Sequence, residues 1–283
     1  MPVTYRWQLD RSPKKYLCPS CGKKTFTPFV DNDGYHAPEI FGRCDREINC
    51  GYFARPDDER VIVEPRKAEY TPPSLIRIDD FESTLTGYID NTLFVFLSQH
   101  FGVAETRRLF TDYCIGIDQI TTTRDWCIFW QVDIDGHVRG GKMIRYRKDG
   151  HRDHSHSATW YHACHKDRYP DFNLVQCFFG EHLLKLNPMK KVAIVESEKT
   201  AVIASFYLPE YVWLATGGKG GLNRGKCAVL RNRNVTLFPD LGAYDDWRSQ
   251  AHNYGFTVSR MLEDIATAEQ REQGLDLADF LIN

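Results

Sequence analysis

Three short apolar segments in the second half of the chain predict a buried parallel sheet. Residues 192–195, 212–215 and 235–238 are rich in Val, Ile, Leu and Phe, and helix-like sequence separates each from the next. Strands that are apolar throughout, without polar alternation, are typical of parallel sheets covered on both faces. The order strand, helix, strand, helix, strand predicts an α/β fold with a βαβαβ core. Residues 243–254 predict a further helix, and residues 256–262 predict a fourth strand.

The preceding part of the chain predicts a mixed α+β region. Residues 91–102 carry apolar positions at helical spacing and end at a glycine, and residues 104–110 predict a second helix. Residues 126–149 alternate as strands do, and Asp135-Gly136 in their middle predicts a hairpin turn. These helices and strands therefore form a region distinct in pattern from the parallel core.

Chemically versatile residues follow each of the three apolar segments. Glu196 follows the first, the glycine-rich run 216–221 follows the second, and Asp240 follows the third. Because the carboxyl ends of parallel strands line one crevice, we expect these residues to converge. Carboxylates and a glycine turn suit Mg²⁺ and a phosphate, since backbone N–H groups can approach an anion at glycine. The competing interpretation is that both acids are only helix N-terminal residues favoured by the macrodipole.

Length and composition are those of an ordinary globular protein. The chain has 283 residues, of which 42% are hydrophobic and 26% charged, and its net charge is −2, so overall charge does not indicate a nucleic-acid partner. No apolar run approaches the length of a membrane span, and the N-terminus lacks the apolar stretch of a secretory signal. We expect a cytoplasmic protein without a membrane partner. Prolines and mixed charge in residues 55–80 predict a linker.

Two cysteine pairs near the N-terminus predict a zinc site. The pairs are Cys18 with Cys21 and, at a wider spacing, Cys44 with Cys50. Gly22 supplies the left-handed backbone that a C-x₂-C turn needs. Four thiolates favour structural Zn²⁺ over a set of unrelated cysteines, with His36 as the reserve ligand. The segment is too short for a core of its own, so the metal would supply most of its folding free energy.

Positive charge gathers in two stretches. Residues 139–168 hold eight Lys or Arg against three acids, with interleaved aromatic residues and histidines, and residues 217–233 hold five Lys or Arg and no acid. Cationic side chains can bind phosphates and aromatic rings can stack on bases, so this composition favours binding of single-stranded nucleic acid. An exposed basic loop above buried aromatic residues explains the first stretch equally well. The candidate nucleic-acid contacts are Arg139, Lys142, Arg145, Arg147, Lys148, Trp160, Arg224 and Lys226.

The order of these features resembles DNA primases of the bacterial and phage type. Glu196 in VESEKTA, the TGG turn at 216–218 and Asp240 in LFPD resemble the Toprim fold, and GRCDREINCGY resembles the zinc ribbon of primase-like proteins of mobile elements. Gly140-Gly141-Lys142 and Phe179-Gly180 resemble the basic hairpin and the Phe-Gly motif of the primase core. The resemblance implies four parts: a zinc ribbon at 1–54, a linker at 55–80, a mixed α+β primase-core subdomain at 81–188, and a doubly wound Toprim domain with a closing helix at 189–283.

The sequence departs from the Toprim pattern after the third apolar segment. The family has a second aspartate two residues after the first, but Leu241 and Gly242 follow Asp240. Asp245 or Asp246, about one helical turn later, is the candidate replacement. The resemblance implies a catalytic set of Glu196, Asp240, Asp245, Asp246 and Lys199, and phosphate or cofactor contacts at Gly217, Gly218 and Lys219.

The resemblance implies a primase-like nucleotidyltransferase in the replication of a mobile element or phage. Single-stranded DNA would be the template and nucleoside triphosphates the substrates, with Mg²⁺ or Mn²⁺ at Glu196 and Asp240 and structural Zn²⁺ in the ribbon. Two alternatives stay open: a catalytically reduced module that binds single-stranded DNA or a replication origin, and a Toprim nuclease. A replicative helicase encoded elsewhere is a further candidate partner.

Overall fold

The chain folds into two compact units, Met1–Thr71 and Pro72–Asn283, which are described separately. The structure is a computed structural model, and it describes residues 7–46, 50–56, 71–118, 125–218 and 220–282. Most of the predicted linker, residues 57–70, lies outside the described residues. Within these ranges, no helix has both the length and the apolar character needed to cross a bilayer. The four-part division expected from the sequence stays a prediction.

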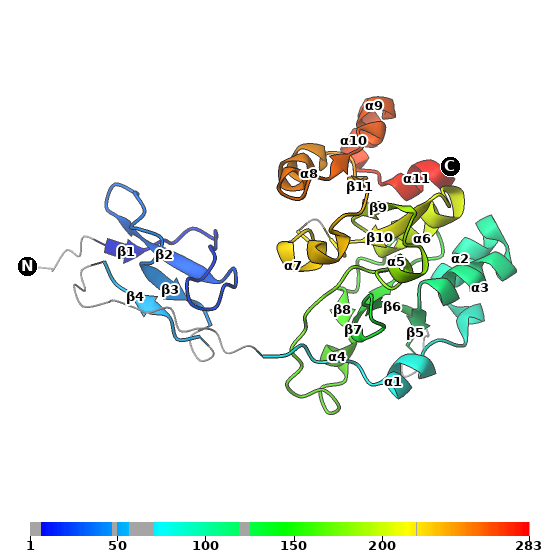
Figure 1. Cartoon of the computed structure of the whole chain (residues 1–283), viewed down its shortest axis with the longest axis horizontal. Coiled ribbons are helices and arrows are strands. Elements are labelled where there is room, and N and C mark those ends of the chain that lie inside the picture. The colour runs from blue at the N-terminus through cyan, green and yellow to red at the C-terminus, as the bar shows by residue number, and fades with distance from the viewer. Residues whose placement is uncertain (1–6, 47–49, 57–70, 119–124, 219, 283) are drawn as a thin grey trace, which may run out of the picture. The chain divides into compact units, whose positions relative to one another are not determined.

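The N-terminal unit is a small antiparallel sheet (Figure 1). Its strands, in spatial order, are β1 (Trp7–Leu9), β2 (Phe26–Asp31), β3 (Gly42–Cys44) and β4 (Phe53–Ala54). Among the described residues of this unit, the buried apolar cluster consists of Phe26, Tyr52, Ala54 and two of the cysteines. So small an apolar core gives little stability by itself, as the sequence predicted.

The C-terminal unit begins with helices packed beside an antiparallel sheet. The elements are α1 (Ile78–Ser83), η1 (Tyr88–Asp90), α2 (Thr92–Phe101), α3 (Val103–Asp112), β5 (Ile115–Ile117), β6 (Trp126–Val132), β7 (Val138–Arg145), β8 (Thr159–Trp160), α4 (Tyr161–Cys164) and α5 (Leu183–Leu186). The helix expected over 91–102 is confirmed: the Asn91 side chain caps it, and Gly102 ends it at a φ of 81°. The hairpin of β6 and β7 around Asp135-Gly136 is also confirmed.

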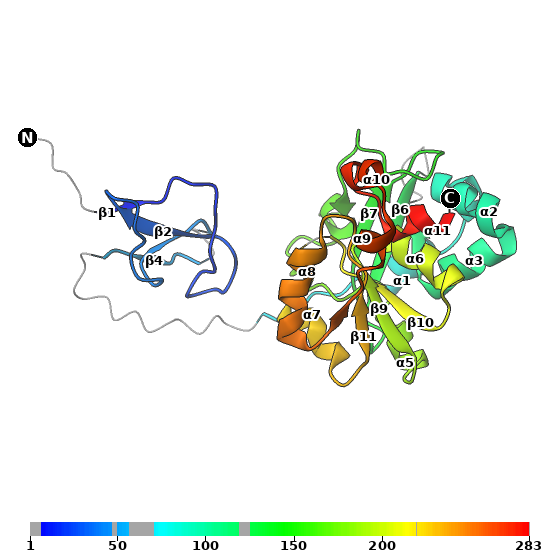
Figure 2. The same ribbon diagram turned by 90° about the horizontal axis from the view of Figure 1, so that it is seen from above.

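A parallel sheet with its helices completes the unit (Figures 1 and 2). The strands lie in the order β10 (Tyr211–Ala215), β9 (Lys191–Val195), β11 (Val235–Leu237) and β12 (Thr257–Val258). The helices are α6 (Glu198–Tyr207), α7 (Arg224–Cys227), η2 (Ala228–Leu230), α8 (Tyr244–Ala251), η3 (His252–Tyr254), α9 (Met261–Ile265), α10 (Ala268–Gln273) and α11 (Leu277–Ile282). All pairings in this sheet are parallel, which confirms the predicted βαβαβ core.

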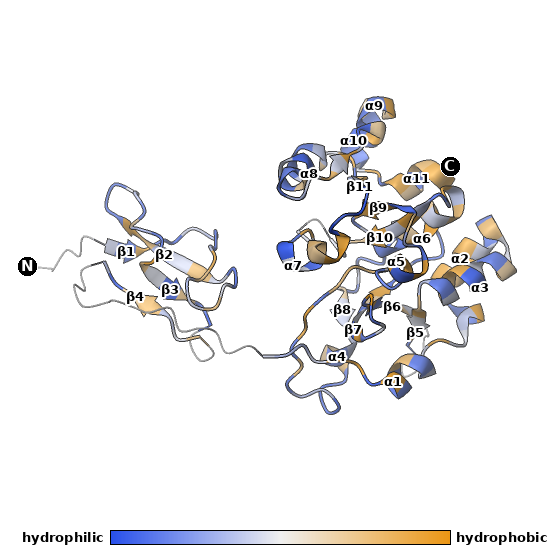
Figure 3. Ribbon diagram, viewed as in Figure 1, coloured by the Kyte–Doolittle hydropathy of each residue, from blue (hydrophilic) through white to orange (hydrophobic). Residues whose placement is uncertain are grey.

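Both faces of the parallel sheet are buried. Ala193 and Val195 of β9 belong to a core shared with α6, α11 and the antiparallel sheet, whereas Val192 and Ile194 pack on the other side with Trp247 of α8. The apolar strands contrast with the largely hydrophilic α8 in Figure 3, and α6 and α8 lie on opposite sides of β9 in Figure 2. The continuous apolar segments of the sequence thus follow from burial on both faces.

The predicted fourth strand is shorter than expected. Residues 256–262 were expected to be a strand, but β12 covers only Thr257–Val258 and α9 begins at Met261. The Ser259 hydroxyl accepts a hydrogen bond from the Met261 N–H at 3.2 Å, and this local contact turns the chain out of the sheet into the helix.

Candidate metal and phosphate sites

The four N-terminal cysteines form one cluster. The Sγ atoms of Cys18, Cys21, Cys44 and Cys50 all lie within 4.8 Å of one another. The Sγ–Sγ distance is 3.7 Å between Cys18 and Cys50 and 3.9 Å between Cys21 and Cys44. A tetrahedral Zn²⁺ with Zn–S bonds of about 2.3 Å needs sulfur atoms about 3.8 Å apart. The predicted ligand set therefore fits Zn²⁺.

Glycines make both cysteine turns possible. Gly22 and Gly51 each follow a cysteine, and both have left-handed φ angles, 66° and 64°. The reserve ligand His36 is not part of the cluster; it lies 3.5 Å from Asp10 and packs edge-on against Tyr16. Glycine, which has no Cβ atom, is favoured at each turn because the left-handed region is costly for other residues.

Glu196 and Asp240 line one cavity of about 350 Å³ in the C-terminal unit. Glu196 directly follows β9, and Asp240 lies three residues after the end of the neighbouring β11. Gly217 and Gly218, beyond the end of β10, line the same cavity. The carboxyl ends of adjacent parallel strands thus bring together residues that are 44 positions apart in the sequence.

The Asp240 carboxyl group is in an unusual environment. Burial, together with the negative charges of Glu196, Asp276 and Asp279, raises its pKa to about 8. Its Oδ1 atom is buried and has no hydrogen-bond partner among the described residues. Because an unpaired buried carboxylate is costly, this side chain calls for either a proton or a cation.

Two aspartates of the C-terminal segment reach this cavity, and the sequence analysis missed both. Asp276 and Asp279 line it, while each side chain accepts a hydrogen bond from the other residue's backbone N–H at the start of α11. Asp276 also accepts a bond from the Thr200 hydroxyl of α6 at 2.7 Å. The D-x-x-D spacing at a helix start was visible in the sequence, but it indicates capping as readily as it indicates a ligand.

The proposed replacements for the missing aspartate lie elsewhere. Asp245 and Asp246 are exposed residues in the first turn of α8, and neither lines the cavity. The helical-turn spacing after Asp240 was the reason for choosing them. That choice is wrong in its geometry, because Gly242, at a φ of 80°, turns the chain between Asp240 and the helix.

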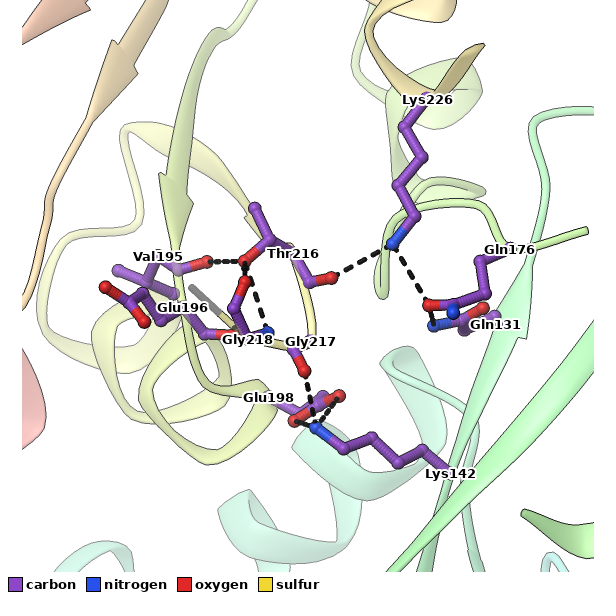
Figure 4. Close-up of polar contacts among 10 residues, drawn as sticks. All are labelled: Gln131, Lys142, Gln176, Val195, Glu196, Glu198, Thr216, Gly217, Gly218 and Lys226. Carbon is purple, nitrogen blue, oxygen red and sulfur yellow. Dashed lines mark hydrogen bonds and ion pairs between the residues drawn. The ribbon is translucent and has the colours of Figure 1, made fainter. Parts of the chain in front are cut away.

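A half-buried lysine fixes the glycine turn (Figure 4). The Lys142 ammonium group of β7 donates to both carboxylate oxygens of Glu198, at 3.0 and 3.1 Å, and to the Gly217 carbonyl oxygen at 2.8 Å. Glu198 is 1% exposed. Lys142 was expected to contact nucleic acid, but these bonds use its donors within the protein. It is a positioning residue, and Glu198 is a partner that the sequence analysis did not find.

The glycine turn offers fewer free N–H groups than expected. Gly217 donates its N–H to the Glu196 carbonyl oxygen at 3.0 Å, and Gly218 donates a longer bond to the Thr216 hydroxyl at 3.4 Å. Gly217 is therefore not available to a phosphate through its N–H group. Lys219, the third predicted contact in this turn, lies outside the described residues.

Basic and histidine side chains line the side of the cavity formed by the loop after β7. His151, Arg152 and His154 belong to this loop, and Lys199 of α6 joins them. The Lys199 ammonium group donates to the Gly150 carbonyl oxygen at 3.2 Å, which ties the loop to α6. Acids and cations in one cavity suit a metal ion and a polyphosphate together.

The remaining predicted nucleic-acid contacts divide into exposed and engaged side chains. Lys226 is 6% exposed and bonds to Gln176 and the Thr216 carbonyl oxygen, and burial lowers its pKa, so its prediction as a nucleic-acid contact is wrong. Arg139 and Arg145 are each paired with a carboxylate, of Asp133 and Asp125. Trp160 is half-buried, and the exposed members of the set are Arg147, Lys148 and Arg224.

Residues 91–241, more than half of the chain, match the family described as a domain of unknown function, DUF6371. The chain belongs to the DUF6371 family. Residues 5–62 match a second family, described as a zinc beta-ribbon finger, and this match covers all four clustered cysteines. No curated protein matches the chain by sequence.

The structure of this DUF6371 protein is similar to those of primases. It matches the primase fragment of the bacteriophage T7 primase-helicase protein at 13% identity, covering 87% of this chain and 89% of that one, with a TM-score of 0.40. It matches the DnaG catalytic core at 15% identity, 68% and 79% coverage and a TM-score of 0.38. It matches the DnaG catalytic domain bound to ssDNA at 13% identity, 70% and 79% coverage and a TM-score of 0.43. Likenesses this distant do not transfer an activity.

The acidic cavity of this DUF6371 protein fits a divalent cation. The buried, unpartnered Oδ1 of Asp240 is the atom that a cation would satisfy. Among the described residues, these acids do not form a group of three whose ligand atoms lie within 4.8 Å of one another. An ion would therefore use one or two carboxylates and take its other oxygens from water or phosphate, which is the mode that Mg²⁺ favours.

Proposed function

We propose that this protein is a primase-like nucleotidyltransferase that extends a strand on a single-stranded DNA template. The observation that carries the proposal is the convergence of Glu196, Asp240 and the glycine turn in one cavity, with a buried carboxylate oxygen that lacks a partner. Carboxylates that hold a metal beside cations that hold phosphates are the requirement of phosphoryl transfer.

Glu196 and Asp240 would hold Mg²⁺ or Mn²⁺, and Asp276 and Asp279 stand close enough to the site to line the same cavity. When bound, the metal neutralises charge on the nucleoside triphosphate and lowers the pKa of the attacking hydroxyl group. Arg152 and Lys199 would bind the triphosphate oxygens. Lys142, paired with Glu198, holds the Gly217 carbonyl oxygen and thereby fixes the glycine turn beside the cavity.

The zinc ribbon would bind the template. Its lysines and arginines, including Lys14, Lys23, Lys24 and Arg43, supply cations for phosphates, while Zn²⁺ holds the fold of the unit. A helicase partner and a role in a mobile element rest only on the resemblance seen in the sequence.

A catalytically reduced binding module is the second candidate. It is favoured by the position of Asp245 and Asp246 outside the cavity, which leaves the third strand with a single acid at the site. The two candidates share the same binding surface and differ only in chemistry. No observation in the structure favours the nuclease.

Primer synthesis on single-stranded DNA with labelled ribonucleotides and Mg²⁺ separates the candidates. We expect products longer than a dinucleotide with the wild-type chain, and a loss of about a hundredfold or more with Glu196→Gln. Asp245→Asn, an acid outside the cavity, is the matched control and is expected to retain activity. Absence of product from the wild type with either metal, while it still binds the template, would support the binding module. Shortened template would indicate a nuclease.

A further inference from the structure

A second cavity, of about 820 Å³, is lined by residues that precede the amino ends of β11 and β12. It is lined by Arg224 of α7, by Arg231 and Arg233 of the segment before β11, and by Tyr254 and Phe256 before β12. The segments that form it precede the amino ends of two strands, whereas Glu196 and Asp240 follow the carboxyl ends. The two cavities therefore stand at opposite ends of β11 and share no lining residue.

The charged side chains that line this cavity are all positive. Three arginines line it, and no aspartate or glutamate is among the described residues that do so. Arg233 donates to the carbonyl oxygens of Asn187 and Lys190, at 2.8 and 3.0 Å, so it is held in place while it keeps its positive charge. Arg224 and Arg231 are exposed. Guanidinium groups collected without carboxylates attract phosphate, which they bind through paired N–H donors.

Two aromatic rings form another part of the wall. The ring centroids of Tyr254 and Phe256 are 5.5 Å apart, with an angle of 31° between the planes, and both residues are half-buried. Asn232 and Asn253 are exposed on the same wall. Rings provide flat surfaces on which a base can stack, and amide groups can both donate to and accept from its edge.

We propose that this cavity binds one nucleotide unit, with its phosphate on Arg224 and Arg231 and its base against Tyr254 or Phe256. The unit comes either from a single-stranded nucleic acid or from a free nucleotide, since both carry the same phosphate and base. The site is independent of the proposed catalytic function. The seven residue steps from Arg233 to Asp240 span at most about 25 Å, so one strand of modest length can reach both cavities.

The test uses the full chain and a fluorescein-labelled oligothymidylate, with binding measured by anisotropy over a range of salt concentrations. We expect the Arg224→Ala/Arg231→Ala variant to bind about tenfold more weakly, and its slope of log K against log salt to fall by about 0.7, because the two arginines together neutralise one phosphate of the strand. Arg248→Ala, an exposed arginine of α8 outside the cavity, is the control and should behave as wild type.

Photo-crosslinking locates the base. An oligonucleotide containing 5-iododeoxyuridine should crosslink to the peptide that holds Tyr254 and Phe256, and Tyr254→Leu, which removes one aromatic face but keeps an apolar side chain, should reduce the yield several-fold. Competition by ATP at micromolar concentration would assign the site to free nucleotides, and persistence of the crosslink in ATP would assign it to a strand. Three results would overturn the proposal. The double variant could bind with wild-type affinity and salt slope, Arg248→Ala could lose as much affinity as the double variant, or no crosslink could form to this peptide.

Discussion

At the scale of single residues, Asp240 links the stability of the protein to pH. Its pKa is raised from 3.8 to about 8 in the folded chain, first by burial and then by Glu196 and the two C-terminal aspartates. The folded state therefore holds a proton that the unfolded chain releases near pH 4, and its stability falls as the pH rises from about 4 to about 8. In metal-free protein we expect Asp240→Asn to remove this loss, which is at most about 6 kcal/mol.

Urea unfolding of the metal-free chain at several pH values measures this effect. Asp245→Asn, on the exposed face of α8, is the control that changes the same charge outside the cavity. Addition of Mg²⁺ at pH 8 should stabilise the wild type and leave Asp240→Asn unchanged. Equal pH slopes in wild type and Asp240→Asn would show that the carboxyl group does not titrate as its burial requires.

Loss of the Lys142 side chain should destabilise the C-terminal unit strongly. Substitution by methionine leaves Glu198, 1% exposed, without its cation, and removal of one partner of a buried pair costs about 3–5 kcal/mol. Lys148→Met, at an exposed position after the same strand, is expected to change the free energy of unfolding by less than about 0.5 kcal/mol. A cost for Lys142→Met no larger than that for Lys148→Met, in urea titrations at pH 7, would refute the assigned positioning role.

At the scale of elements, the glycine turn after β10 tests whether backbone position matters to the cavity. Gly217 has a φ of 81°, and a Cβ there would lie 3.2 Å from a Glu198 carboxylate oxygen. Gly136 has a similar φ of 90° and open space around it. We expect alanine at either site to destabilise the chain by about 1–2 kcal/mol, because both angles are left-handed.

Only Gly217→Ala should also weaken cation binding, because only there does the added methyl group press on the Lys142–Glu198 pair. Measuring the Mn²⁺ affinity of Gly217→Ala and Gly136→Ala tests this difference. If both variants bind Mn²⁺ as tightly as wild type, the turn does not shape the cation site.

Periodicity predicted the elements better than it predicted their ends. The apolar runs of β9, β10 and β11 were visible because burial on both faces excludes polar residues, and the cap and stop of α2 at Asn91 and Gly102 are local features. The strand expected over 256–262 was predicted too long, because the Ser259 hydroxyl bond that ends β12 competes with an apolar pattern. Strand propensity alone cannot decide whether the apolar pattern or the local hydrogen bond determines the end of the strand.

The site was predictable where strand ends define it and not where tertiary contacts do. Glu196 and Asp240 could be placed from the parallel topology alone. Lys142 and Glu198 are 56 residues apart, and their ion pair depends on how β7 packs against α6. The contact of Asp276 with Thr200 depends in the same way on how α11 packs against α6. For the same reason a basic stretch in the sequence could not be divided into buried Lys226 and exposed Arg224.

At the scale of the whole molecule, the two units should differ in their dependence on zinc. Among the residues that the structure describes, those of the Met1–Thr71 unit form a small apolar cluster around the cysteines, whereas those of the Pro72–Asn283 unit form three larger cores. We expect a strong chelator, or Cys18→Ser with Cys21→Ser, to unfold the first unit and leave the second folded.

Limited proteolysis followed by mass spectrometry reports the unfolding of each unit separately. The zinc content of the wild type should be near one ion per chain. Cys164→Ser, at an exposed cysteine outside the cluster, is the control. A ribbon that resists protease equally well with and without zinc would contradict the structural role of the metal.

The central claim is that Glu196 and Asp240 hold one divalent cation together. Titration of the full, zinc-loaded chain with Mn²⁺, followed by electron paramagnetic resonance, tests it directly. We expect wild type and Asp245→Asn/Asp246→Asn to bind Mn²⁺ alike. We expect Glu196→Gln/Asp240→Asn to bind it more than about tenfold more weakly, because the anionic oxygens that a hard cation requires are gone. Equal Mn²⁺ affinity in all three proteins would contradict it.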